Sequence, residues 1–264
     1  MAKKRIGNYH ILKQIGEGGF AYTYLAEHCI LKQPACIKQN ISLSEKDKEM
    51  LIQEAKLLWE IHHHSLPSLR DMIQLDDGSL AMVMSFIPGK DLFKIKTEDY
   101  PEGIDPEHVC WITQRILGAF RYLHFHGIIH GDVKPQNKII QPKQHNAVLV
   151  DYGLSTAFPG RFTKCPGCTP AFAAPEQLEG KPPIPETDIY GLGASMIFVL
   201  GGNIGALTMP ARVPERLQKF FLQMVKHDPL KRPNDAVALA DELGNIREEI
   251  FGRRSSSRDL TITD

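Results

Sequence analysis

The sequence predicts an α+β chain with two lobes: a small lobe made mostly of strands with one main helix, and a larger lobe that is mostly helical. Two observations predict this division. In the first ninety residues apolar residues mostly alternate with polar ones, as in strands, and only one segment has helical spacing. After that point the apolar residues recur at helical spacing. We expect the lobes at 1–84 and 91–250, a connector at 85–90 and a disordered tail at 251–264.

The small lobe is expected to be mostly sheet. A hairpin at 9–26 carries the glycine-rich run GEGGF at its tip, and a third short strand follows at 35–38. Ser44, with Asp47 three residues later, predicts the capped start of the one helix. Two further strands should flank a turn at 76–79.

The large lobe is expected to begin with a long helix. Asp105 can cap that helix, Pro106 suits its first turn, and Gly127 ends it. The apolar run at 191–202 is about twelve residues long, too short to cross a bilayer, and predicts a buried core helix. The rest of the lobe should be helix and loop, apart from short strands at 128–130, 138–140 and 147–150.

The composition indicates an ordinary soluble protein. Hydrophobic residues make up 42% of the chain and charged residues 23%, and the formal net charge is zero. A neutral chain has no electrostatic reason to bind nucleic acid or an anionic membrane. The five cysteines are an odd number, and no apolar signal peptide opens the chain, so we expect a cytoplasmic location. We expect no membrane segment, and the sequence does not determine the oligomeric state.

Residues that could bind a nucleotide occur first in the chain. Gly16, Gly18 and Gly19 would let backbone N–H groups approach phosphate oxygens, although a flexible turn could have the same sequence. Lys38 on the third strand could bind a phosphate, and Glu54 on the helix could pair with it. Each signal is weak when taken alone, because most strand lysines are simply solvated.

Residues that could carry a reaction follow in the large lobe. Asp132, Lys134 and Asn137 lie within HGDVKPQN, and Asp151 opens DYG after an apolar strand. Two carboxylates and an amide near one point suit a divalent metal ion and a hydroxyl nucleophile, because such ions prefer oxygen ligands. The order and spacing of these groups carry most of the prediction.

In that order the motifs resemble those of protein kinases, from about Tyr9 to Leu243. The resemblance is to Ser/Thr kinases of the eukaryotic-like (Hanks-type) family, and LPSLRD resembles its bacterial variant. It implies the bilobal kinase fold and transfer of the γ-phosphoryl group of Mg-ATP to protein Ser or Thr hydroxyls. The matching motifs are GEGGFA, ACIK, MSFIPGKDLF, HGDVKPQN, DYG, TPAFAAPE, TDIYGLG and HDPLKRP.

The resemblance implies a role for each matching residue. Asp132 would accept the proton of the substrate hydroxyl, and Lys134 would neutralise the transferring phosphoryl group. Asn137 and Asp151 would hold Mg²⁺ or Mn²⁺. The residues implied to bind the nucleotide are Gly16, Gly18, Gly19, Thr23, Cys36, Lys38, Glu54, Met84, Ser85, Ile87, Asp91 and Asp151.

The resemblance also implies two structural interactions in the large lobe. Glu176 and Arg232 would form a buried ion pair that holds the activation segment, the stretch from DYG to APE, on this lobe. Asp188 would brace the catalytic loop through backbone N–H groups.

Three departures from the family pattern stand out. Gly131 replaces the arginine that in many relatives binds a phosphorylated activation segment, so we expect activity without that phosphorylation. Lys138 replaces an aliphatic residue, for which the sequence offers no explanation. Few residues separate Gly201 from Pro214, where relatives usually have another helix, so a docking surface for protein substrates should be reduced.

Two other functional classes compete with an active protein kinase. A pseudokinase that acts as a binding scaffold would be favoured if Lys38, Asp132 or Asp151 were replaced, and none is. A small-molecule kinase of related fold is disfavoured by TPAFAAPE and HDPLKRP.

Cys165 and Cys168 could form a redox switch or half a zinc site, but a tight loop with two thiols is the simpler interpretation. The run HHH at 62–64 is better explained as a surface segment than as a metal site.

Overall fold

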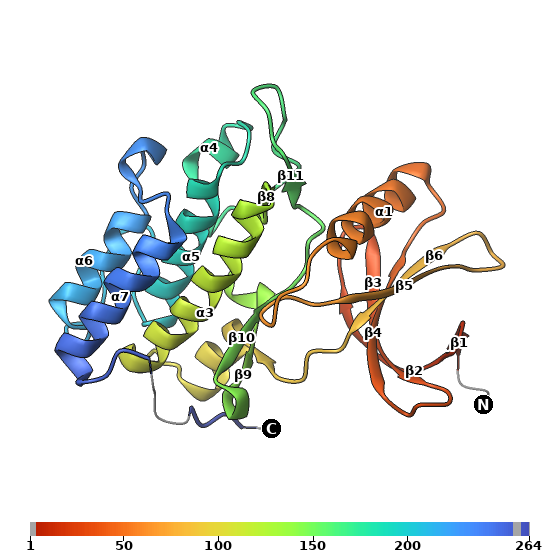
Figure 1. Ribbon diagram of the computed structural model, residues 1–264, viewed down its shortest axis with the longest axis horizontal. Helices are drawn as coiled ribbons and strands as arrows, with labels where there is room; N and C mark the ends of the chain where they lie inside the picture. The colour runs from red at the N-terminus through yellow and green to blue at the C-terminus, as the bar shows by residue number, and fades with distance from the viewer. Residues whose placement is uncertain (1–3, 256–259, 264) are drawn as a thin grey trace. The chain divides into compact units, whose positions relative to one another are not determined.

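The protein folds as two compact units, Met1–Ile87 and Pro88–Asp264. The structure is a computed structural model that describes residues 4–255 and 260–263 (Figure 1). We call the first the strand unit and the second the helical unit, and the α+β class expected from the sequence is confirmed. The exact lobe boundaries at 1–84, 85–90 and 91–250 stay a prediction.

The strand unit contains one antiparallel sheet of six strands in the order β1-β2-β3-β4-β6-β5, with one helix, α1 (Figure 1). The expected hairpin, third strand and later pair of strands are all present. The sequence did not predict β1, because two residues are too few to show a period. The elements are β1 (Arg5–Ile6), β2 (Tyr9–Glu17), β3 (Ala21–His28), β4 (Pro34–Asn40), α1 (Glu45–Trp59), β5 (Leu69–Gln74) and β6 (Leu80–Ser85).

The start of α1 follows the sequence prediction in part. The Ser44 side chain accepts a hydrogen bond from the backbone N–H of Asp47 at 3.2 Å, as an N-cap does. The carboxylate of Asp47 does not complete a capping box, because it accepts a hydrogen bond from Ser42 Oγ at 2.6 Å instead. The helix therefore begins where it was expected, with one of the two reciprocal bonds.

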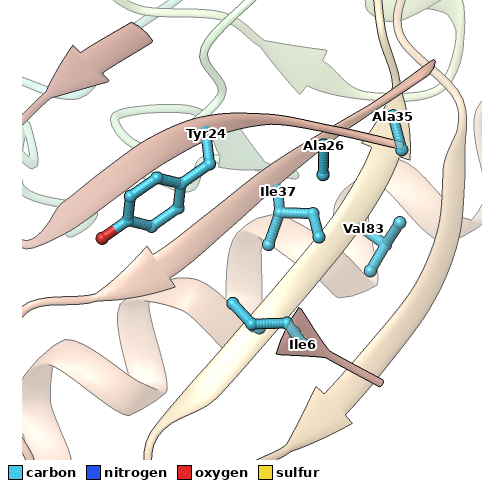
Figure 2. Packing of buried hydrophobic residues seen from close by; sticks show 7 residues of the cluster. Ile6, Tyr24, Ala26, Ala35, Ile37 and Val83 are labelled. Carbon is cyan, nitrogen blue, oxygen red and sulfur yellow. The ribbon is translucent and has the colours of Figure 1, made fainter. Parts of the chain in front are cut away.

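An apolar cluster lies on one face of the sheet (Figure 2) and shows which side chains of β4 point to the opposite face. Ala35 and Ile37 of β4 belong to this cluster, and both are fully buried. Successive side chains of a strand point to opposite faces, so Cys36 and Lys38 lie on the other face of β4. The cluster consists of Ile6, Tyr24, Ala26, Ala35, Ile37, Ala81 and Val83.

The helical unit is built around α3 and α5, which pack with α7 and α6 respectively (Figure 1). The predicted start of α3 is confirmed, because Asp105 accepts from Glu107 N at 2.8 Å and Pro106 is the first helical residue. The elements are β7 (Lys90–Asp91), α2 (Leu92–Lys94), the π-helix η1 (Ile95–Asp99), α3 (Pro106–Phe125), β8 (Ile128–Ile129), η2 (Pro135–Asn137), β9 (Lys138–Gln141), η3 (Pro142–Gln144), β10 (Asn146–Leu149), β11 (Thr156–Ala157), α4 (Pro175–Leu178), α5 (Pro185–Val199), α6 (Glu215–Met224), η4 (Pro229–Lys231) and α7 (Ala236–Phe251).

Two small sheets position the loops of the helical unit. One has the order β10-β9-β7 and the other pairs β11 with β8. The three expected strands at 128–130, 138–140 and 147–150 correspond to β8, β9 and β10. Between β8 and β9 lies the segment 130–137, which carries Asp132, Lys134 and Asn137 and is called the catalytic loop below.

The apolar run at 191–202 lies in α5 and its C-terminal turn, and it is buried as expected. Across the described residues, every helix is too short or too polar to span a membrane. The described chain from 201 to 214 forms turns and one isolated bridge between Asn203 and Thr208, with no helix, in agreement with its short length.

Part of the predicted tail makes contacts in the helical unit. Phe251 still belongs to α7, and Leu260 is buried with 3% of its surface exposed. The Tyr100 hydroxyl donates to the carbonyl of Thr261 at 2.7 Å. Residues 256–259 and 264 lie outside the described residues, so the expectation of disorder over 251–264 stays a prediction for them.

Candidate active site

Lys38 and Glu54 form an ion pair inside the strand unit. Lys38 Nζ lies 2.9 and 2.8 Å from the two carboxylate oxygens of Glu54, and only 9% and 2% of the two side chains are exposed. The Phe20 ring packs against the ammonium, whose nitrogen is 4.9 Å from the ring centroid. Strand β4 and helix α1 therefore hold one positive charge in a defined place, because a buried ion pair loses much of its energy when it is distorted.

The glycines of GEGGF are not required by the fold itself. A Cβ at Gly19 would meet nothing within 4 Å, and at Gly18 only the carbonyl oxygen of Ala21 at 3.7 Å. At Gly16 the nearest atom would be Thr23 Cβ at 3.5 Å, an ordinary contact. The backbone of these three residues also avoids the left-handed region. The hairpin therefore has room for a Cβ at all three positions, so its own packing does not explain the glycines.

The other predicted nucleotide-binding residues of the strand unit lie on β3, β4, β6 and the chain that follows. In the sheet register Thr23 pairs with Lys38, and Cys36 pairs with Met84. Ser85 ends β6, and Ile87 is the last residue of this unit. The sheet therefore brings Thr23, Cys36, Lys38 and Met84 onto neighbouring strands.

Asp91 belongs to the helical unit, on β7. It is the N-cap of α2, where its side chain accepts a hydrogen bond from Lys94 N at 2.9 Å. Asp91 pairs in register with Ile139 of β9, the strand that directly follows the catalytic loop.

The catalytic loop concentrates polar groups around Asp132. Lys134 Nζ lies 2.6 Å from one carboxylate oxygen of Asp132, and the Thr169 hydroxyl donates to the other at 2.7 Å. Lys134 also donates to Thr169 Oγ1 at 3.0 Å. The amide of Asn137 donates to the carbonyl and to the carboxylate of Asp132 at 2.9 and 3.1 Å. A carboxylate, an ammonium and a hydroxyl therefore meet within hydrogen-bond distance, and Asp132 is only 6% exposed.

The oxygen donors of Asn137 and Asp151 are of the type that a divalent metal ion prefers. Asn137 uses its amide nitrogen for both hydrogen bonds, so its amide oxygen has no hydrogen bond to the described residues. Val150 N donates to the carbonyl of Asn137 at 2.9 Å. Asp151, which is exposed, is the residue after Val150. The described residues contain no group of three or more His, Cys, Asp or Glu side chains able to hold a metal. A Mg²⁺ ion commonly takes one or two protein ligands and completes its shell with phosphate and water.

Asp188 of α5 binds the backbone of the catalytic loop. Its two carboxylate oxygens accept hydrogen bonds from the backbone N–H groups of His130 and Gly131, at 2.9 and 2.8 Å. His124 Nε2 lies 2.9 Å from the same carboxylate. Burial lowers the pKa of His130, although Asp188 and Asp132 oppose this effect, and its ring packs on Tyr152 with centroids 4.8 Å apart.

Comparison with known proteins agrees with this geometry. A sequence profile described as the protein kinase domain matches residues 9–206. The chain belongs to the protein kinase family. Among similar proteins, it is 30% identical over 260 residues to the "Carbon catabolite-derepressing protein kinase" of Candida tropicalis, which covers 90% of this chain and 41% of that protein. It is 27% identical over 274 residues to "Serine/threonine-protein kinase D" of Synechocystis sp., covering 91% of this chain and 52% of that one.

A third relative has a similar length of match. The chain is 25% identical over 276 residues to "Serine/threonine-protein kinase pkn3" of Myxococcus xanthus, covering 91% of this chain and 50% of that protein. The chain thus spans about half the length, or less, of these curated relatives. Two of these three relatives are named as serine/threonine-protein kinases, and this domain is of the Hanks-type Ser/Thr class.

In this kinase domain the expected ion pair between Glu176 and Arg232 is present. The two carboxylate oxygens of Glu176 lie 2.7 and 2.8 Å from the guanidinium nitrogens of Arg232. The Thr187 hydroxyl donates to Glu176 at 2.9 Å. Burial is the largest single effect and would raise the pKa of Glu176, but the hydrogen bonds and charge of Arg232, a backbone hydrogen bond and the Thr187 hydroxyl together lower that pKa. The carboxylate is therefore held in its charged form where the activation segment ends.

Gly131 has a conformational role that the kinase sequence did not reveal. Its φ is +76°, in the left-handed region, and an added Cβ would lie 2.9 Å from the carbonyl oxygen of Leu154. The sequence indicated only that glycine lacks the charge of arginine. The tertiary position now adds a steric reason for a residue with no side chain.

Thr169 is a site residue whose contacts the sequence did not predict. Its hydroxyl joins Asp132 and Lys134, which are 37 and 35 residues away in the chain. The only available signal was its position at the start of TPAFAAPE.

Cys165 and Cys168, nearby in the same segment, are both free thiols, and Cys165 Sγ donates to the carbonyl of Gly167 at 3.2 Å.

Proposed function

We propose that this domain is an ATP-dependent protein kinase that phosphorylates Ser and Thr hydroxyls, with Mg²⁺ or Mn²⁺ as the metal ion. The observation that carries the proposal is the contact of a threonine hydroxyl with Asp132 at 2.7 Å and with Lys134 at 3.0 Å. A general base must lie within about 2.6–3.2 Å of the oxygen whose proton it accepts. The loop can thus hold a hydroxyl oxygen between a base and a positive charge.

The proposed reaction is an in-line displacement at the γ-phosphorus of ATP. A substrate hydroxyl oxygen forms the new P–O bond, the bond between the γ-phosphorus and the bridging oxygen breaks, and ADP leaves. Asp132 orients the hydroxyl and accepts its proton. Lys134 neutralises charge on the transferring group. When bound, the metal ion held by Asn137 and Asp151 supplies positive charge for the phosphate oxygens.

Each unit carries residues that we propose as nucleotide contacts. Lys38, kept in place by Glu54, would contact the α- and β-phosphates, and the GEGGF hairpin would cover them. The other proposed contacts are Thr23, Cys36, Met84, Ser85 and Ile87 for adenine and Asp91 for ribose. Because the transition state demands little covalent chemistry, placing these charges supplies most of the acceleration.

We also propose that activity does not depend on phosphorylation of the activation segment. Gly131 offers no guanidinium to bind a phosphate there, and the strain of its left-handed backbone disfavours a side chain at this position. Activity measured before and after phosphatase treatment tests this. Equal rates support the proposal, and a fall to background contradicts it.

A transfer assay tests the proposed function. The wild-type domain, Asp132→Asn and Lys38→Met are incubated with labelled ATP, Mg²⁺ or Mn²⁺ and a generic basic protein. Incorporation of label into Ser and Thr by the wild type alone supports a protein kinase. Binding of ATP without transfer by a folded wild type supports a pseudokinase scaffold instead. We also propose a cytoplasmic location.

A further inference from the structure

Lys138 is the most unusual buried group in the helical unit. It is the first residue of β9, directly after Asn137, and its side chain has no exposed surface. Its ammonium donates one hydrogen bond within the described residues, to Ser195 Oγ at 3.0 Å. A buried ammonium normally has a carboxylate partner or several acceptors, because an ion that leaves water loses a large solvation energy. One neutral hydroxyl compensates for little of that loss.

Ser195 connects Lys138 to the other end of the catalytic loop. Ser195 lies on α5, is fully buried, and its Oγ is 2.7 Å from the carbonyl of Gly191 and 3.1 Å from that of Val133. The hydroxyl accepts from Lys138 and has one hydrogen to donate to a carbonyl. Val133 follows Asp132, and Lys138 follows Asn137. The two sides of the segment 132–137 therefore meet at one oxygen atom.

Helix α5 touches the loop directly at this place. A Cβ added to Gly191 would lie 2.9 Å from the carbonyl oxygen of Val133, so glycine allows the close approach. One end of α5 also carries Asp188, which accepts from the N–H groups of His130 and Gly131. The helix thus supports the loop at two points, and Ser195 with Lys138 forms the second.

The burial of Lys138 costs stability, because one neutral hydroxyl replaces little of the solvation energy that its ammonium loses. Two apolar side chains of similar volume would avoid this cost, and such replacements of buried charged groups are often neutral or stabilising. Hydrogen bonds are directional, however, and apolar contacts are not.

We propose that Lys138 and Ser195 are positioning residues that fix the catalytic loop on α5 and so keep Asp132 and Asn137 in the geometry needed for phosphoryl transfer. The inference rests on the proposed function. It explains why a lysine occupies a place where an aliphatic residue is expected. Its energetic consequence is that the pair lowers stability and raises turnover.

The test compares Lys138→Met, Ser195→Ala and the double variant Lys138→Met/Ser195→Ala with wild type. Methionine keeps the length of lysine without its charge, so the single methionine variant should fold with an equal or higher Tm. We expect kcat to fall about tenfold or more, because small displacements of reacting groups have large effects on rate. The KM for ATP should stay within about twofold, since neither residue is expected to contact the nucleotide. The double variant should be no slower than Lys138→Met, because the two residues act as one pair.

A matched control is Lys219→Met on α6. Lys219 is exposed and pairs with Glu215 at 2.6 Å, so its loss should leave both kcat and Tm unchanged. Unchanged kcat in Lys138→Met would overturn the proposal, because an apolar residue would then serve equally well. A fall of kcat together with a lower Tm would also overturn it, in favour of a purely structural role. A folded wild type that transfers no phosphate would refute the proposed function, and the positioning role would fall with it.

Discussion

The ion pair between Glu176 and Arg232 allows the sharpest prediction of stability. All five N–H donors of the Arg232 guanidinium are used, two of them on the Glu176 carboxylate. The other three go to the backbone carbonyls of Lys226, Glu186 and His227, at 2.6, 3.1 and 2.9 Å. The Arg232 side chain is fully buried. Replacing Arg232 by methionine therefore removes every one of these bonds at once.

The expected loss is near the top of the range for single substitutions. Removing one partner of a buried ion pair costs about 3–5 kcal/mol, because the other charge is left without compensation. In Arg232→Met the Glu176 carboxylate keeps the hydrogen bond from Thr187 at 2.9 Å, which offsets part of that cost. The three carbonyls add about 1 kcal/mol each where water cannot reach them. For a domain of this size we expect Tm to fall by about 10 to 20 °C.

A double-mutant cycle measures the pair itself. Thermal unfolding of wild type, Glu176→Gln, Arg232→Met and the double variant should show that the double variant loses less than the two single variants together. Arg216→Met is the control, because Arg216 and Glu249 form an exposed pair at 3.6 Å and contribute within about 0.5 kcal/mol. Additive losses in the cycle, or an Arg232→Met protein as stable as the Arg216→Met control, would refute the reasoning.

Four further predictions follow from single positions. Gly19→Ala should leave Tm unchanged, since its Cβ meets no atom within 4 Å, and should raise the KM for ATP; an unchanged KM would contradict the role of the hairpin. Lys38→Met should reduce transfer by on the order of a hundredfold or more and lower Tm, because Glu54 is left buried without its cation; comparable activity would count against the proposed site. Gly131→Ala should lower the free energy of unfolding by about 1–2 kcal/mol through its left-handed φ, and a stability equal to wild type would show that the backbone relaxes. The lowered pKa of Glu176 stabilises the fold at pH values above the usual glutamate range, so Tm should decline as the pH falls through that lowered pKa; the decline should be smaller in Glu176→Gln, and identical pH profiles would argue against the assignment.

Much of the architecture could be predicted from the sequence, because a long helix or strand repeats its hydrophobic period several times. Helix α3 shows apolar residues at helical spacing over 20 residues, with a cap at Asp105 and a stop at Gly127. The hairpin of β2 and β3 has a clear alternation and a glycine-rich tip. Of the four strands with two residues, only β8 was predicted; β1, β7 and β11 were not, because a strand this short shows no hydrophobic period and depends on its pairing with a neighbour.

The candidate site was predicted as a set of residues rather than as a set of contacts. The order of the motifs indicated that Lys38 pairs with Glu54, and the structure contains that ion pair. The same order did not indicate that the hydroxyl of Thr169 lies between Asp132 and Lys134. Such a contact depends on the path of the activation segment in space, which local sequence patterns do not specify.

By itself the sequence determined which chemical groups this kinase domain possesses and along which helices and strands they lie, since residue type and hydrophobic period are local properties. Only the tertiary structure decided the partner of each buried group. In that structure the ammonium of Lys138 donates to the hydroxyl of Ser195, and a Cβ added at Gly131 would meet the carbonyl oxygen of Leu154. The physical reason is that burial, backbone φ and hydrogen-bond partners depend on segments far apart in the chain, and these come together only when the core packs.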